Sequence, residues 1–177
     1  MTRLLLLVGA CVMTLGYSKC VFVDGEGRGS IGDDHPGAGD DFATSLVLRD
    51  STGTATTSFV MGEPIRFDLE IGNLRNRTTT LRFPDAQIYD FYLFDADDRV
   101  LWRWSEDMAF AQVVTRLTFA PRATRSYTLT WNGVLADGTQ LPAGQYRARG
   151  VIVADEFTGD PLDPGELGSR RVDFTVR

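Results

Sequence analysis

Apolar residues alternate with polar ones from Phe42 onward, and this alternation sets the fold class. In the clearest stretch, residues 65–71, every second side chain is apolar and the side chains between are Arg66, Asp68 and Glu70. Successive side chains of a strand point to opposite sides, so a period of two predicts a strand with one buried face. Further strands are predicted around Leu46 and Leu48, around Leu81 and Phe83, and at 88–95, 99–104, 113–119, 126–131, 145–154 and 171–176.

Turn-forming residues such as glycine, proline and aspartate separate these predicted strands, as at 62–64, 120–122, 137–138 and 142–144. About seven to nine short strands at this spacing are typical of an immunoglobulin-like β-sandwich. We therefore predict an all-β fold with a single immunoglobulin-like β-sandwich over residues 42–177, following a signal peptide and a flexible tether. The chain has 177 residues, which is enough for one such domain with a proper core.

Aromatic residues are concentrated in residues 88–112, which raises the choice between a core and a binding surface. They are Tyr89, Phe91, Tyr92, Phe94, Trp102, Trp104 and Phe110. The acidic turn 95–98 joins two of the predicted strands into a hairpin, and the first of these strands is apolar on both faces. Such a strand lies inside a sheet with something covering its outer side, so most of these rings are predicted to be core. The alternative for Trp102 or Trp104 with Phe110 is an outward-facing part of a binding patch.

Two details of the hairpin carry their own predictions. Strict alternation places Val100 on the same face as Trp102 and Trp104. Asp90 lies between two aromatic residues, so we expect a buried carboxylate that accepts hydrogen bonds from backbone amides or from Arg103. A structural role is favoured for it.

The first 18 residues have the pattern of an export signal. A positively charged start, residues 1–3, precedes an apolar run at 4–16 that is too short to span a bilayer. Gly16 and Ser18 supply the small residues expected three and one before the cleavage point. Residues 1–18 are therefore predicted to be removed, and the protein is expected in the periplasm, the cell envelope or the extracellular space.

Cleavage there would remove Cys11 and leave Cys20 as the one cysteine, which excludes an intrachain disulfide. A lone cysteine just after an export signal raises two hypotheses: attachment of a lipid at Cys20, or a free or intermolecularly paired thiol. A lipid on Cys20 is the one route by which we expect membrane binding.

Residues 19–41 are rich in glycine and aspartate and contain little to bury, so a flexible linker is predicted. The one histidine, His35, lies there, without the spacing of a known metal motif. No metal or cofactor is predicted. Calcium at the acidic turn 95–98 or in residues 155–166 is the alternative to simple solvation of those carboxylates.

The formal charge of −6 argues against nucleic acid as a partner, because phosphate backbones attract a surplus of lysine and arginine. An enzyme is not predicted, since the sequence has no glycine-rich phosphate loop or nucleophile elbow, and its histidine lies in the linker. A carboxylate pair across two strands is the one catalytic arrangement that spacing leaves open.

Several short motifs keep a fixed spacing between residues 64 and 153: Tyr89-Asp90-Phe91, Trp102-Arg103-Trp104-Ser105, Phe110-Ala111-Gln112, Trp131-x-Gly133, Asp137-Gly138 and Pro142-x-Gly144-x-Tyr146. In these motifs and their spacing the chain resembles the BsuPI family of intracellular proteinase inhibitors. The resemblance implies an immunoglobulin-like domain that binds and inhibits a serine protease of the subtilisin type. Residues 155–168 look like an insertion before the last strand.

An inhibitor of this kind needs a rigid loop that enters the protease cleft. One candidate is the loop at 134–143, with Leu135, Asp137, Gly138, Leu141 and Pro142 as its partner-binding residues, and the other is 155–168. The rival hypothesis is an envelope module that binds another protein or a glycan, or helps assembly, with no inhibitory activity.

Overall fold

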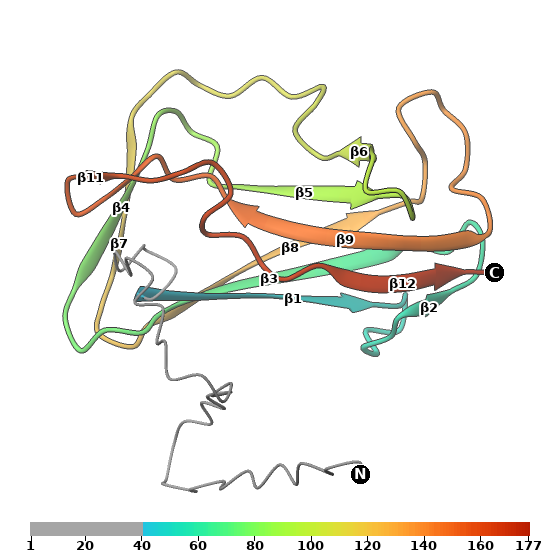
Figure 1. Cartoon of the computed structure of the whole chain (residues 1–177), viewed down its shortest axis with the longest axis horizontal. Helices are drawn as coiled ribbons and strands as arrows, with labels where there is room; N and C mark the ends of the chain where they lie inside the picture. Colours follow the sequence, from blue (N-terminus) through green and yellow to red (C-terminus); the bar gives the residue numbers. More distant parts are fainter. Residues whose placement is uncertain (1–40) are drawn as a thin grey trace, which may run out of the picture. The chain divides into compact units, whose positions relative to one another are not determined.

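The computed structural model describes residues 41–177, and every regular element in that part of the chain is a strand (Figure 1). The strands are β1 (Phe42–Arg49), β2 (Ser58–Phe59), β3 (Ile65–Asn73), β4 (Thr79–Phe83), β5 (Tyr89–Phe94), β6 (Val100–Arg103), β7 (Thr115–Phe119), β8 (Thr124–Trp131), β9 (Gly144–Ile152), β10 (Glu156–Phe157), β11 (Asp160–Pro161) and β12 (Val172–Val176). The predicted signal peptide with Cys11, and the predicted linker with Cys20 and His35, lie outside the described residues except for Asp41. Within residues 41–177 no helix has the length and apolarity needed to cross a membrane.

Two larger sheets, built mostly of long strands, face each other, and a third sheet of four shorter strands continues them at one end. The first sheet has the order β1-β3-β8 and the second the order β2-β12-β9-β5-β6, while β11-β10-β4-β7 form the third. All neighbours are antiparallel except β2 and β12. The prediction of an all-β sandwich is confirmed.

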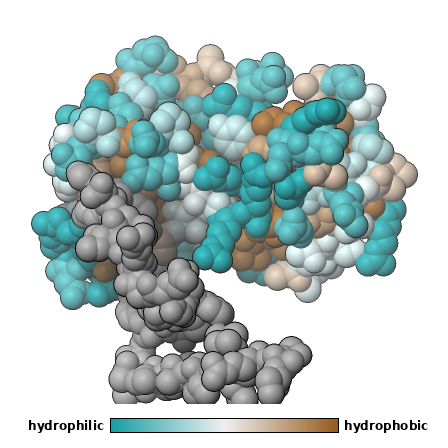
Figure 2. Space-filling view, viewed as in Figure 1, coloured by the Kyte–Doolittle hydropathy of each residue, from teal (hydrophilic) through white to brown (hydrophobic). Residues whose placement is uncertain are grey.

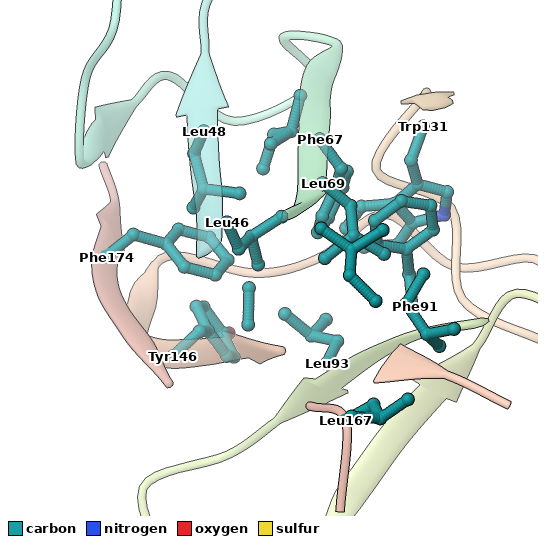
Figure 3. Close-up of a cluster of buried hydrophobic side chains, with 14 of the residues drawn as sticks. Leu46, Leu48, Phe67, Leu69, Phe91, Leu93, Trp131, Tyr146, Leu167 and Phe174 are labelled. Carbon is teal, nitrogen blue, oxygen red and sulfur yellow. The ribbon is translucent and has the colours of Figure 1, made fainter. Parts of the chain in front are cut away.

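The core lies between the two larger sheets, as Figure 3 shows. Side chains of β1 and β3 point toward those of β5, β9 and β12, and the Phe67 and Phe91 rings are 5.4 Å apart across the layer. β3 shows the predicted pattern, because its apolar side chains are buried and its charged ones face outward. At Gly150 the sheets approach so closely that an added Cβ would stand 2.6 Å from Leu69 Cδ1.

The connection between β9 and β12 covers the outer face of β5, which explains why that strand is apolar on both sides. Residues 155–168, the predicted insertion, form β10 and β11 on the way, and β10 pairs with β4. Leu167 is buried, and its carbonyl accepts a hydrogen bond of 3.2 Å from the Ile152 amide. The segment is therefore a fixed cover of the sheet.

The prediction that Val100 shares a face with Trp102 is wrong. Leu93 stands opposite Trp102, but Phe94 stands opposite Val100, so Leu101 is an extra residue in β6. A β-bulge of this kind shifts the residues beyond it by one position and so to the other face. Val100 consequently lies 54% exposed on the outer face, while Trp102 stays on the core side.

Candidate functional site

Aromatic side chains fill the side of the sandwich where β6 and β8, the edge strands of the two larger sheets, lie opposite each other. Trp102 stacks on Trp131 with 4.8 Å between ring centres, and Trp104 stacks on Tyr89 at the same separation. Phe110 lies against Trp104 at 5.9 Å. These rings are half-buried, except Trp131, which is buried. The predicted outward set therefore packs at the border of the core and supports the chain that follows β6.

Asp90 connects the end of β6 to the start of β5 through hydrogen bonds. Its fully buried carboxylate accepts hydrogen bonds from the Phe91 amide (2.9 Å), the Ser105 amide (3.2 Å) and the Ser105 hydroxyl (2.7 Å). Arg103 Nε donates a fourth bond of 2.6 Å. This hydrogen bond to Asp90 raises the pKa of Arg103 above its ordinary value. The predicted structural role of Asp90 is thus visible in its contacts, and they fix the residue at which the chain leaves the sheet.

Residues 106–114, which we call the β6–β7 segment, run from this fixed point to β7 along the upper side of the molecule in Figure 1. The segment belongs to no strand, and every residue of it except Phe110 is exposed. The side chains of Met108, Val113 and Val114 are 48%, 56% and 46% exposed. The sequence predicted a strand from 113 onward, but β7 begins at Thr115.

Four contacts hold the β6–β7 segment in place. The Met108 amide donates to the Ser105 carbonyl (3.1 Å), which forms a turn at its start. In its middle, the Ala111 carbonyl accepts bonds from the Ala86 amide (3.0 Å) and the Val113 amide (2.8 Å). Between these points the Phe110 ring is anchored on Trp104. The segment is therefore exposed along its length and fixed at its start and its centre.

The loop at 134–143 brings the five predicted partner-binding residues into one hairpin, but it does not expose all of them. Leu141 is only 2% exposed and belongs to the core, and Leu135 is half-buried. Asp137, Gly138 and Pro142 are exposed. A role of this loop in binding a partner stays a prediction.

The tip of this loop forms a tight turn. Hydrogen bonds from the hydroxyl (2.6 Å) and the amide (2.9 Å) of Thr139 lower the pKa of Asp137. Gly138 has a φ of 81°, which favours glycine. At the base, the Tyr146 hydroxyl donates to the Pro142 carbonyl at 2.8 Å. The tip is ordered and polar.

The other predicted loop, 155–168, is tied to the sheet beneath it. Arg149 donates to the carbonyls of Gly165 (2.8 Å) and Ser169 (3.2 Å), and Arg82 pairs with Asp155 at 2.5 Å. A pocket of about 420 Å³ remains between this cover and the outer face of the sheet. Its lining combines apolar side chains with arginines, and includes Tyr92, Val100, Arg103, Arg149 and Leu162.

The acidic turn 95–98 uses its carboxylates within the protein. Asp95 accepts the amides of Asp97 (2.8 Å) and Arg99 (2.9 Å), and Asp98 pairs with Arg147 and Arg171. In the described part of the chain, no group of three or more histidine, cysteine or acidic residues is placed to hold a metal ion. Apolar surface is scattered in small spots between hydrophilic side chains on the face seen in Figure 2.

The model of the BsuPI family, described as intracellular proteinase inhibitor, matches residues 53–157. Among solved structures, the chain is similar to the C-terminal domain of wzt, with 12% identity over 77% of this chain and 74% of that one and a TM-score of 0.48. It is also similar to the CARDB domain of the PF1109 protein from Pyrococcus furiosus, with 10% identity over 78% and 90% of the chains and a TM-score of 0.39. A mutant β-glucosidase from Listeria innocua matches with 10% identity over 76% of this chain and 16% of the enzyme, with a TM-score of 0.40. No curated protein matches the chain.

Proposed function

The chain belongs to the BsuPI family, and from this premise we propose that it inhibits a serine protease of the subtilisin type by binding it, without catalysis of its own. The observation that carries the proposal is the family match over 53–157, which spans β2 to β10 and all turns between them. Inhibition requires shape and rigidity and no catalytic constellation. A β-sandwich can supply the shape and the rigidity.

Rigidity matters because a loop that is ordered before binding loses little conformational entropy in the complex. The same order slows cleavage, since a fixed backbone resists the distortion that the reaction requires. In this protein the connections between strands are held by a core of fully buried side chains such as Phe67, Phe91 and Leu93. The fold can therefore present exposed backbone in one conformation.

We propose that the protein acts outside the cytoplasm, and this location is inferred from the export pattern of residues 1–18. The target would then be an exported protease, either in the envelope or in the medium. Attachment of a lipid at Cys20 would hold the inhibitor at the membrane. The mass of the mature protein tests both points, because cleavage and an added diacylglycerol each change it by a known amount.

The test of the function is a titration of the full-length protein against a subtilisin-type protease. We expect residual protease activity to fall in proportion to added protein while the protein itself stays intact by mass spectrometry. A cysteine protease and a metalloprotease serve as controls for the class of target. If a folded protein leaves several serine proteases fully active, the proposal is wrong, and the envelope binding module becomes the working hypothesis.

A further inference from the structure

We propose that the β6–β7 segment is the part of this protein that enters the protease cleft, with Met108, Val113 and Val114 as its contact side chains. This inference rests on the proposed function and names its binding surface. The segment differs from both loops that the sequence suggested.

The first support is the concentration of exposed apolar side chains. Eight large apolar side chains are exposed in the described part of the chain, and three of them lie within these nine residues. Exposed apolar groups that gather in one place mark interaction sites, because leaving them in water has no structural benefit. Burial of these side chains in a partner would remove apolar surface from water and so favour association.

The second support is the backbone. A partner that binds an extended peptide needs free amide and carbonyl groups to pair with it as an added strand. Within residues 41–177, the amides of Ala109, Phe110 and Gln112 donate no hydrogen bond to the protein. These groups lie between or next to the fixed points at Met108 and Ala111, so the segment offers unpaired backbone without being loose.

The third support is the anchoring from below. Ser105, the residue before the segment, is held by the buried carboxylate of Asp90, and Phe110 is held by Trp104. Phe110 is thus the one residue of the segment that faces the protein, which leaves the side chains on either side of it for a partner. These two anchors, at the start and near the centre of the segment, limit the conformational entropy that it would lose on binding.

The two other loops fit the role less well. The tip of 134–143 is polar, and of the two leucines in this loop Leu141 is buried in the core and Leu135 is half-buried. Most of 155–168 lies outside the family match, which ends at 157, and the loop is bonded to the sheet. The β6–β7 segment lies wholly inside the family match.

The test compares matched substitutions of exposed residues. Met108→Asp and Val113→Asp introduce a charge into the segment, and Met61→Asp and Val60→Asp do the same at a turn with 54% and 66% exposure. All four side chains are exposed, so the melting temperatures should stay close to that of the wild type. We expect the inhibition constant to rise at least about tenfold for the two segment variants and to stay unchanged for the two controls.

Each outcome has a distinct meaning. If the wild type inhibits and the segment variants inhibit equally well, the segment is not the contact surface, and the proposed function stands. If the controls weaken inhibition as much as the segment variants, the effect is one of charge, and the inference is likewise overturned. If the wild type inhibits no protease, the proposed function fails, and this inference fails with it.

Discussion

Replacement of Asp90 by alanine should lower the free energy of unfolding by about 3–5 kcal/mol, because three hydrogen-bond donors lose their buried charged acceptor. The contacts of Asp90 show which hydrogen bonds account for this loss of stability. The amides of Phe91 and Ser105 and the hydroxyl of Ser105 lose a charged acceptor, and each loss costs about 1 kcal/mol or more. Arg103 adds little, because its side chain is 43% exposed and turns toward water.

Asp90→Asn removes the negative charge but keeps the size of the side chain, so it measures the effect of the charge alone. The amide keeps an oxygen for the two backbone donors, but its NH₂ group faces the guanidinium of Arg103, which can only donate. We expect a loss on the order of 1–2 kcal/mol, smaller than that of the alanine variant. Asp97→Asn, in the exposed turn before β6, is the matched control and should leave stability unchanged.

The assay is denaturant unfolding followed by tryptophan fluorescence, since Trp102 and Trp104 lie next to the altered site. Hydrogen exchange adds a local readout: release of Ser105 should accelerate exchange at Met108, whose amide donates to the Ser105 carbonyl. A loss of less than about 1 kcal/mol for Asp90→Ala, with unchanged exchange at Met108, would refute the view that this carboxylate holds the start of the segment.

Three other changes test the remaining parts of the structure. Gly150→Ala should cost about 1–3 kcal/mol by thermal unfolding, because its Cβ would overlap Leu69, while Gly72→Ala, with a contact of 3.2 Å, should cost less. Leu141→Ala should cost about 2–5 kcal/mol if this loop residue belongs to the core, and a loss near zero would place it at the surface instead. Burial alone would raise the pKa of Asp68, but hydrogen bonds from two arginines and a threonine outweigh it and lower the pKa. Such a carboxyl stabilises the fold above its unfolded pKa of about 4, and this contribution is lost as the pH falls further. The stability difference between wild type and Asp68→Asn, measured by urea unfolding at a series of pH values, should therefore shrink below about pH 4, and a constant difference would contradict the assignment.

The fold class was accessible from the sequence because strand alternation is a local property. Residues 65–71 alternate, and β3 buries the side chains that this pattern selects. The bulge at Leu101 was not accessible, because register depends on the partner strand, and no local signal marks the extra residue. The pairing of residues 155–168 was missed for the same reason, since β10 finds its partner β4 more than 70 residues earlier in the chain.

The site was predicted less well than the fold. Turn signals at Asp137 and Gly138 drew attention to 134–143, yet those residues serve the turn itself. Val113 and Val114 were expected to begin the strand at 113–119, because an apolar residue usually indicates burial, and Met108 was assigned no role. Only the structure shows that no strand of residues 41–177 pairs with them. The available signal was a non-alternating apolar stretch between two strands.

Family membership does not identify the target protease, because the residues that carry the family resemblance support the β6–β7 segment and are not its exposed side chains. Asp90, Trp104 and Ser105 belong to the motifs in which the sequence resembles the family, and they form the brace beneath the β6–β7 segment. Phe110, also in one of these motifs, is the anchor that faces the protein. Met108, Val113 and Val114 lie outside these motifs. If the segment is the contact surface, the family shares the means of holding it, and the side chains that choose the protease are free to differ between members. Exchanging residues 106–114 for the same region of another family member should then change which protease is inhibited without changing stability, and an unchanged preference would place specificity elsewhere.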